Sequence, residues 1–253
     1  NGIDNVERWL NMSIPDVYSA ELSEFVFASG LKLLEEWFPD VMYLSTTDYI
    51  QHKYAPEDKE AIKFLTMIDN YLSEISKFDV TMVITADHGM SAKHNKNGDP
   101  QIVFIQDFLD EEFGTNSTNV ILPITDPYIV HHGALGSYAT IYFNEKRIYN
   151  EAFSKLKSLK GIDQICSKDE AVKRFDLPSD RIGDIVITSS EKITLGKTKS
   201  YHDLKSLKEP LRSHGGLSEQ KVPFIINRPI NLSSVKDLKN YDAFFYACEA
   251  SFN

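Results

Sequence analysis

Aspartate and histidine side chains recur where apolar segments of the chain end in turns. Two carboxylates and three imidazoles occupy such positions: Asp48 and His52, Asp87 and His88, and His214. Open α/β sheets build their sites at strand ends, and carboxylate oxygens and imidazole nitrogens are ligands of zinc and related metals. The pattern therefore predicts a metal site assembled from turns that are distant in the sequence.

The spacing of these residues suits metal binding. Asp48 and His52 are four apart, so a helical turn places both side chains on one face. Asp87 and His88 are adjacent in a turn before a glycine, and a double glycine after His214 lets the backbone approach a ligand closely. An ordinary polar turn is the alternative at each place. Three of the seven histidines fall at these turns, which favours the metal site.

An Asp/His/His set with an open position is typical of catalytic zinc, whereas structural zinc sites favour cysteine and closed coordination. The same ligands also suit manganese or iron. Cys166 and Cys248 lie far from the Asp/His turns in the sequence, so neither is expected to be a ligand. Two cysteines in a chain of 253 residues indicate reduced thiols and a cytoplasmic protein.

The other histidines are expected in solvated turns, with a place beside the site as the alternative: His94, His131, His132 and His202. A lysine-rich segment at 189–213 is expected to be a loop. Its lysines either attract an anionic substrate or form a solvated face, and the second is the usual role of a charge run.

Helices and strands alternate in the part of the chain that carries the first ligands. Apolar residues at helical spacing predict helices over 19–38 and 57–78, and apolar runs predict strands at 41–45 and 80–84. This alternation predicts an α/β fold with a doubly wound, mostly parallel sheet and helices on both faces.

The rest of the chain is less regular. Strands are expected at 102–104, 119–122, 137–143, 161–165, 184–188 and 222–227, and helices at 2–10, 106–113, 148–159, 167–174 and 241–250. Ser167 and Glu170 form a capping-box pattern. The domain prediction is a core segment with metal ligands at 1–104, a cap or insert at 105–182, and a return to the core at 183–253.

The composition limits the partners. A net charge of −10 argues against a nucleic-acid partner, which needs clustered lysine and arginine. Bound divalent metals can invert the local field, so a small anionic substrate stays compatible. No apolar run reaches the ~18 residues of a membrane span, and no signal peptide is visible.

The segments 43–52, 85–90 and 212–220 resemble the alkaline phosphatase superfamily of two-metal enzymes, and their flanking residues are similar to the phosphonoacetate hydrolase family within it. The resemblance implies an alkaline-phosphatase-like fold with an inserted cap and two zinc ions per complete site. Asp48, His52 and His214 would hold one zinc, and Asp87 and His88 the other. The family's nucleophilic threonine and carboxylate-binding lysines have no match here, so we expect the C-terminal portion of a longer enzyme.

The implied reaction is hydrolysis of the carbon–phosphorus bond of phosphonoacetate, a small anionic substrate, to acetate and phosphate. Two metals would clamp the attacking and leaving sides of the phosphorus. A homodimer and a partner N-terminal segment are further expectations. The alternatives are a phosphodiesterase or nucleotide pyrophosphatase of the same superfamily and an inactive metal-binding fragment. A metal-dependent phosphoglycerate mutase, which needs a serine nucleophile and more ligands, fits least.

Overall fold

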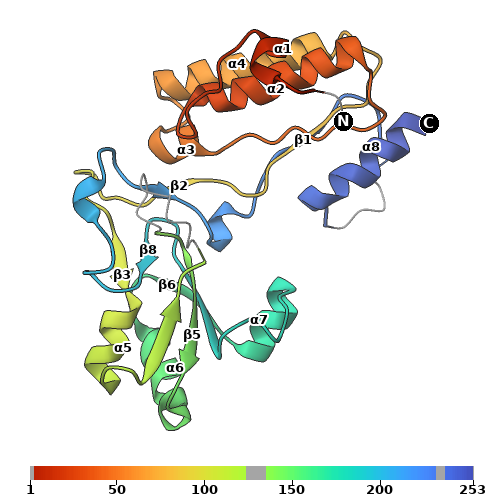
Figure 1. The fold of residues 1–253 in the computed structure, drawn as a ribbon. Coiled ribbons are helices and arrows are strands. Elements are labelled where there is room, and N and C mark those ends of the chain that lie inside the picture. Colours follow the sequence, from red (N-terminus) through yellow and green to blue (C-terminus); the bar gives the residue numbers. More distant parts are fainter. Residues whose placement is uncertain (1–2, 124–134, 232–236, 253) are drawn as a thin grey trace. The chain divides into compact units, whose positions relative to one another are not determined.

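The computed structural model describes residues 3–123, 135–231 and 237–252. The chain forms two compact units, Asn1–Asp87 with Val222–Asn253, and His88–Lys221. Each unit contains helices and strands (Figure 1), so the predicted α/β class is confirmed. The units divide the chain at 87/88 and 221/222, and the predicted segment 105–182 lies inside the second unit. Its assignment as a cap stays a prediction.

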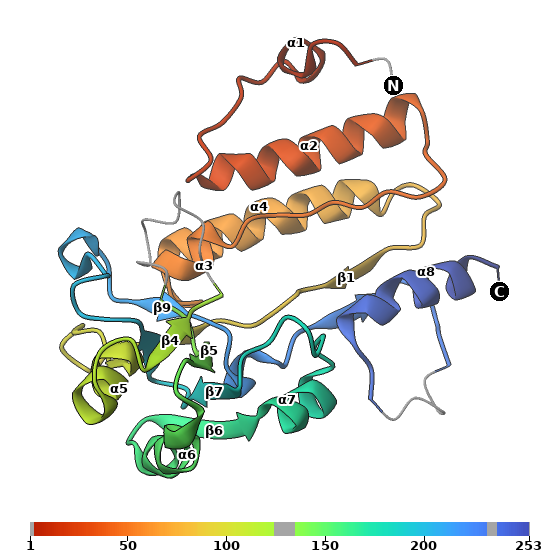
Figure 2. The ribbon, with the colours of Figure 1, turned by 60° about the horizontal axis from the view of Figure 1, so that its bottom comes forward.

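Two long helices dominate the first unit. Helices α2 (Ala20–Glu36) and α4 (Lys59–Ile75) lie side by side (Figures 1 and 2). Both were predicted, and the structure ends them a few residues earlier at the C-terminal side. Their apolar stripes meet in a core that holds Phe27, Leu34 and Ile75. Burial of these stripes stabilises helices whose propensity alone would be marginal.

The strand pair of the first unit is short. β1 (Val83–Thr85) pairs antiparallel with β10 (Phe224–Ile226), and α8 (Ala243–Phe252) packs beside β1. Asn227 extends the ladder because its side chain accepts from the Met82 N–H at 2.8 Å and donates to the Val80 carbonyl at 3.0 Å. The unit also contains the short helices α1 (Val6–Leu10), α3 (Tyr49–Lys53) and η4 (Asn240–Asp242).

The predicted strand at 41–45 forms no ladder with other described residues. Its burial nevertheless alternates as in a strand. Met42 and Leu44 pack into the helix core, whereas Val41 and Tyr43 are 72% and 73% exposed. One face of this apolar segment is therefore covered, and the other is mostly exposed, with Tyr43 6.0 Å from Phe244 between ring centroids.

The second unit is built on a four-stranded antiparallel sheet in the order β4-β5-β7-β6. Every residue of β7 is buried. Ile185 and Ile187 join the main core together with the helices α5 and α6, and Val186 faces a second cluster under α7. The bounds are α5 (Ile105–Phe113), β4 (Thr118–Ile121), β5 (Tyr138–Phe143), η1 (Lys146–Ile148), α6 (Tyr149–Ser158), β6 (Ile162–Ser167), α7 (Lys168–Phe175) and β7 (Ile185–Ser189).

The predicted capping box is confirmed at α7. The Ser167 hydroxyl accepts from the Glu170 N–H at 3.4 Å, and the Glu170 carboxylate accepts from the Ser167 N–H at 2.8 Å. Two of the amides at the helix start are thereby satisfied.

Smaller ladders complete the second unit. β3 (Ile102–Phe104) pairs parallel with β8 (Thr194–Gly196), and β2 (Ser91–Ala92) pairs antiparallel with β9 (Arg212–Ser213). The prediction of an unbroken loop over 189–213 is wrong, because this segment contains β8, η2 (Leu204–Ser206) and β9. Strands of two or three residues are too short to produce a detectable period.

The ladders of the described residues are mostly antiparallel, since only β3 and β8 run parallel among them. The coarse α/β prediction holds, and the doubly wound parallel sheet is not observed in this part of the chain. Both cysteines are free thiols, as predicted. Within the described ranges, no helix has the length and apolar character needed to cross a membrane.

Candidate metal centre

Asp48 and His52 form a carboxylate–imidazole pair in the first unit. Asp48 is the N-cap residue of α3, and His52 lies one turn later. His52 Nε2 is 3.1 Å from Asp48 Oδ2. The imidazole side chain is 2% exposed and the carboxylate 44% exposed. The predicted shared face is confirmed, and it presents one nitrogen and one oxygen ligand side by side.

Packing against α4 fixes α3. Ile50 is buried between the two metal-ligand candidates of the helix and joins Ala61 and Phe64 of α4 in one apolar cluster. The His52 N–H donates to the Asp48 carbonyl at 3.0 Å, which closes the turn. The sequence therefore folds locally into a short helix because one face carries apolar side chains and the other carries the pair.

Asp87 and His88 lie just beyond the end of β1. The preceding backbone is held by Asn240, whose side-chain amide donates to the Ala86 carbonyl at 3.2 Å. Asp87 is exposed and closes the first unit, while half-buried His88 opens the second. His88 Nδ1 is 2.9 Å from the Gly89 carbonyl. A carbonyl only accepts, so Nδ1 is the donor in this bond, as is common for metal-binding histidines.

The second unit brings His88 and His214 together. Their rings stack with centroids 3.6 Å apart and planes inclined by 7°. His214 directly follows β9, which pairs with β2 three residues beyond His88. Two of the predicted ligands, 126 positions apart in the sequence, therefore lie side by side.

The two glycines after His214 pack closely against Ser137. Gly215 has φ +101°, a conformation that disfavours a side chain. The His214 carbonyl accepts from the Ser137 N–H at 2.8 Å, and a Cβ on Gly216 would meet the Ser137 side chain at 3.0 Å. The double glycine therefore packs closely against Ser137, and the predicted approach to a ligand stays a prediction.

A buried ion pair beside these turns was missed at the sequence level. Lys93 is 0% exposed and Glu219 2% exposed, and Lys93 Nζ lies 3.2 Å from Glu219 Oε1. Burial raises the pKa of Glu219, but hydrogen bonds from Ser218, Ser91 and the Gly216 amide, with the charge of Lys93, bring that pKa below its usual value. Burial lowers the pKa of Lys93, and Glu219 opposes that change.

The remaining histidines have local roles where they are described. His94 Nδ1 bonds the Asn95 carbonyl at 2.8 Å. His202 was expected to be solvated, and this is wrong: it is 6% exposed, and its Nε2 accepts from the Lys197 N–H at 2.9 Å. It packs there to hold the loop after β8. His131 and His132 lie outside the described residues.

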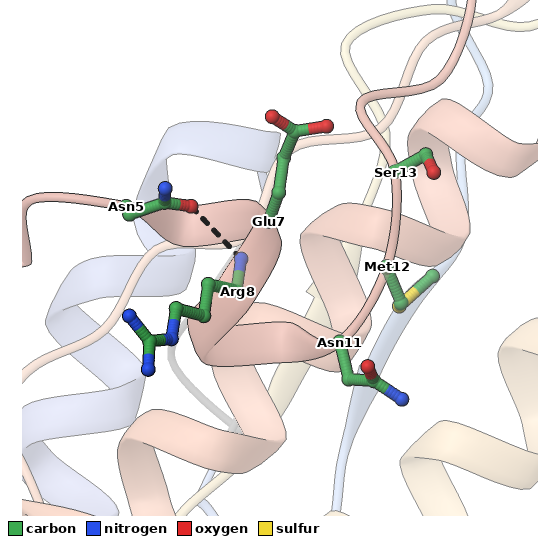
Figure 3. Close-up of a pocket in the computed structure, with 6 residues that line it drawn as sticks. All are labelled: Asn5, Glu7, Arg8, Asn11, Met12 and Ser13. Carbon is green, nitrogen blue, oxygen red and sulfur yellow. Dashed lines mark hydrogen bonds between the residues drawn. The ribbon is translucent and has the colours of Figure 1, made fainter.

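An open, polar depression beside α1 contains none of the predicted ligands (Figure 3). In it the Asn5 side chain accepts from the Arg8 N–H at 2.9 Å and so caps the helix. The lining residues are Asn5, Glu7, Arg8, Asn11, Met12 and Ser13. This feature is explained by helix capping and carries no predicted catalytic group.

The chain belongs to the type I phosphodiesterase / nucleotide pyrophosphatase family, whose model matches residues 2–217. All five predicted metal ligands lie within the matched residues. The family resemblance predicted from the sequence is thereby supported by an independent comparison.

Within that class, the chain is similar to the phosphonoacetate hydrolase of Sinorhizobium meliloti 1021. Identity is 55% over 99% of this chain, with a TM-score of 0.94, for crystal structures in complex with phosphonoformate and with phosphonoacetate. The chain spans 61% of the length of those chains. Murine ectonucleotide pyrophosphatase / phosphodiesterase 5 shares the fold, with a TM-score of 0.59 and 18% identity over 89% of this chain and 59% of its own.

Proposed function

We propose that the protein carrying this chain is a metal-dependent hydrolase that cleaves the carbon–phosphorus bond of phosphonoacetate to acetate and phosphate. The observation that carries the proposal is the 55% identity and TM-score of 0.94 to a phosphonoacetate hydrolase over 99% of this chain. Because those relatives are longer, the activity is proposed for the whole protein.

We propose that five residues hold two zinc ions: Asp48, His52 and His214 one, and Asp87 and His88 the other. Within each unit, the side-chain oxygen and nitrogen atoms of these residues are of the types that zinc binds. Asp48 and His52 present oxygen and nitrogen on one helix face, and His88 is oriented through Nδ1 as metal-bound histidines usually are. Imidazole and carboxylate without thiolate are typical of catalytic zinc.

When bound, the metals would supply electrostatic stabilisation of the phosphonate oxygens and activate the attacking hydroxyl group. The residues of this chain bind and orient. The imidazoles of His88 and His214 stack almost in parallel, at an angle of 7°. We propose that the whole protein supplies a threonine nucleophile and a cationic group for the substrate carboxylate. That cation would stabilise the carbanion that leaves phosphorus.

The larger architecture is also a proposal. The exposed side chains Val41 and Tyr43 lie on an extended segment without a ladder among described residues. Ile225 on β10 is 55% exposed as well. These features support the proposal that the whole protein has a doubly wound, mostly parallel sheet with helices on both faces. The division into core 1–104, cap 105–182 and core 183–253 belongs to this proposal.

A cytoplasmic homodimer completes the proposed setting. Two free cysteines support a reducing compartment. The first unit exposes apolar side chains, and we propose that some of them form the subunit interface of the whole protein. Size-exclusion chromatography with light scattering of the whole protein measures its mass directly, and a monomeric mass would remove the dimer from the proposal.

The substrate is tested by supplying zinc-loaded protein with phosphonoacetate and, separately, with bis(4-nitrophenyl) phosphate. We expect acetate and phosphate in equal amounts, at a rate far above that of nitrophenol release. The family description favours a phosphodiesterase as the second candidate, and faster nitrophenol release would establish it. Turnover of neither compound would favour the metal-binding fragment.

A further inference from the structure

Glu219 connects the turn that carries His88 with the turn that carries His214. Its Oε2 accepts from the Gly216 N–H at 2.9 Å, two residues after His214. Its main-chain carbonyl accepts from the Gly89 N–H at 2.6 Å, one residue after His88. One buried residue thereby bonds the backbone of both turns.

Lys93 holds the other side of the Glu219 carboxylate. Its Nζ donates to Glu219 Oε1 at 3.2 Å and to the Glu191 carbonyl at 2.6 Å. Its main-chain N–H donates to the Leu211 carbonyl at 2.8 Å, just before β9. Ser218 donates to the same Oε1 at 2.6 Å. The carboxylate is thus fixed from three directions within the second unit.

Stability alone does not explain this arrangement. Taking both charges out of water carries a desolvation cost that often cancels their attraction, and well-packed apolar residues would stabilise the fold equally well. An apolar pair in place of Glu219 and Lys93 would lack the directional side-chain hydrogen bonds that this network makes. The network fixes the relative position of the two turns, and with it the stacked imidazoles, whose centroids are 3.6 Å apart.

We propose that Glu219, supported by Lys93, is a positioning residue that holds His88 and His214 in register for metal binding. The inference rests on the proposed metal function. Neither residue is a ligand in it: Glu219 acts through the backbone of Gly89 and Gly216. Groups that orient metal ligands typically contribute 10- to 100-fold to metal affinity.

Glu219→Gln tests the proposal because it keeps the size of the side chain and removes its charge and one acceptor oxygen. Zinc affinity is measured by competition with a chromophoric chelator, alongside kcat and KM for phosphonoacetate. We expect zinc affinity to fall about 10- to 100-fold. We expect kcat to fall at limiting zinc and to recover in excess zinc, with KM unchanged.

Asp184→Asn is the matched control in the same unit. The Asp184 carboxylate also accepts from a backbone amide, Phe143 N–H at 2.8 Å, and from a lysine, Lys146 Nζ at 2.6 Å. It bonds neither of the two turns. We expect this variant to lower the unfolding temperature and to leave zinc affinity within twofold of the wild-type value.

Equal zinc affinity in Glu219→Gln and wild type, with a lower unfolding temperature as in the control, would show a structural role only and overturn the proposal. If Glu219→Gln does not fold, Ser218→Ala decides: a loss of about two- to tenfold supports the proposal, since one hydrogen bond is removed, and no loss overturns it. The zinc measurement needs no substrate, so failure of the proposed reaction remains distinguishable.

Discussion

The two imidazoles of the second unit are the residues on which the metal proposal depends most. His88 is oriented by the Gly89 carbonyl, and His214 is anchored through its own carbonyl to Ser137. A ring-to-backbone contact therefore orients the His88 imidazole, whereas the contact at His214 fixes its main chain. A histidine ring held as in His88 meets a metal without first losing side-chain freedom.

His214→Ala removes one proposed ligand and leaves its backbone anchor in place. We expect zinc affinity to fall more than ~100-fold, because even outer residues contribute up to that factor. Competition with a chelator measures it. His94→Ala is the control, since His94 bonds the Asn95 carbonyl in a separate turn. Unchanged zinc affinity in His214→Ala, or an equal loss in the control, would contradict the assignment.

At this scale the sequence singled out His88 and His214 by their position before glycine, and the second unit places them side by side; their role as metal ligands stays a prediction. The sequence could not predict Lys93 or Glu219, because charged residues are rarely buried and nothing local marks the exceptions. It also assigned His202 to a solvated loop, since the ring of Phe104, whose centroid lies 6.2 Å from that of His202, is distant in the sequence.

At the scale of elements, the turn after β9 is as important as the proposed ligand His214 that it carries. Gly215 adopts φ +101°, and a Cβ there would lie 3.4 Å from the Ser137 amide. That amide donates to the His214 carbonyl. The conformation of Gly215 and the hydrogen bond that holds the His214 main chain are therefore coupled.

Gly215→Ala should distort this turn. We expect a loss of about 1–3 kcal/mol in unfolding free energy from the strained conformation, together with weaker zinc binding. Gly114→Ala is the comparison, because Gly114 has φ +85° and no atom of the described residues lies within 4 Å of the place a Cβ would take there. It should lose stability only. Denaturant unfolding and chelator competition measure both, and weakened zinc binding in both variants would refute the coupling.

Low pH should weaken the hydrogen bonds that Asp184, just before β7, accepts from the Phe143 N–H of β5 and from Lys146. Burial raises the pKa of Asp184, but the bonds from Lys146 and the Phe143 amide outweigh it and hold that pKa below its usual 3.8. The carboxylate therefore stabilises the fold above about pH 4, and this contribution is lost as pH falls through the lowered pKa. Unfolding free energy should fall less steeply below pH 4 in Asp184→Asn than in wild type. Equal slopes would contradict this.

Helices were predictable because their apolar stripes are local: α2 and α4 lie within the expected ranges. Strand pairing was not, because it joins distant residues. The segment 41–45 has the alternation of a strand without a described ladder, and β8 was missed because its three residues carry no period.

The bare face of the first unit is the main feature at the scale of the whole molecule. Val41 is 72% exposed on an otherwise apolar segment, and the chain spans 61% of the length of its solved relatives. The sequence predicted the α/β class and the family because both follow from local patterns and motifs. The order of the strands could not be predicted, because strand pairing joins residues that are distant in the sequence.

Val41→Thr tests whether the side chain at position 41 is exposed or buried in the whole protein. In the 253-residue chain the side chain is exposed, so the change should alter unfolding free energy by less than ~0.5 kcal/mol. In the longer protein that we propose, the added hydroxyl would be buried and should cost about 1–3 kcal/mol. Chemical denaturation of both forms measures the difference. The same small effect in both would argue against coverage of this face.

The most direct test of the two-metal account is a crystal of the zinc-loaded whole protein measured at the zinc absorption edge. The account predicts two anomalous peaks, one bounded by Asp48, His52 and His214 and the other by Asp87 and His88. A single peak, no peak, or peaks surrounded by other residues would contradict it.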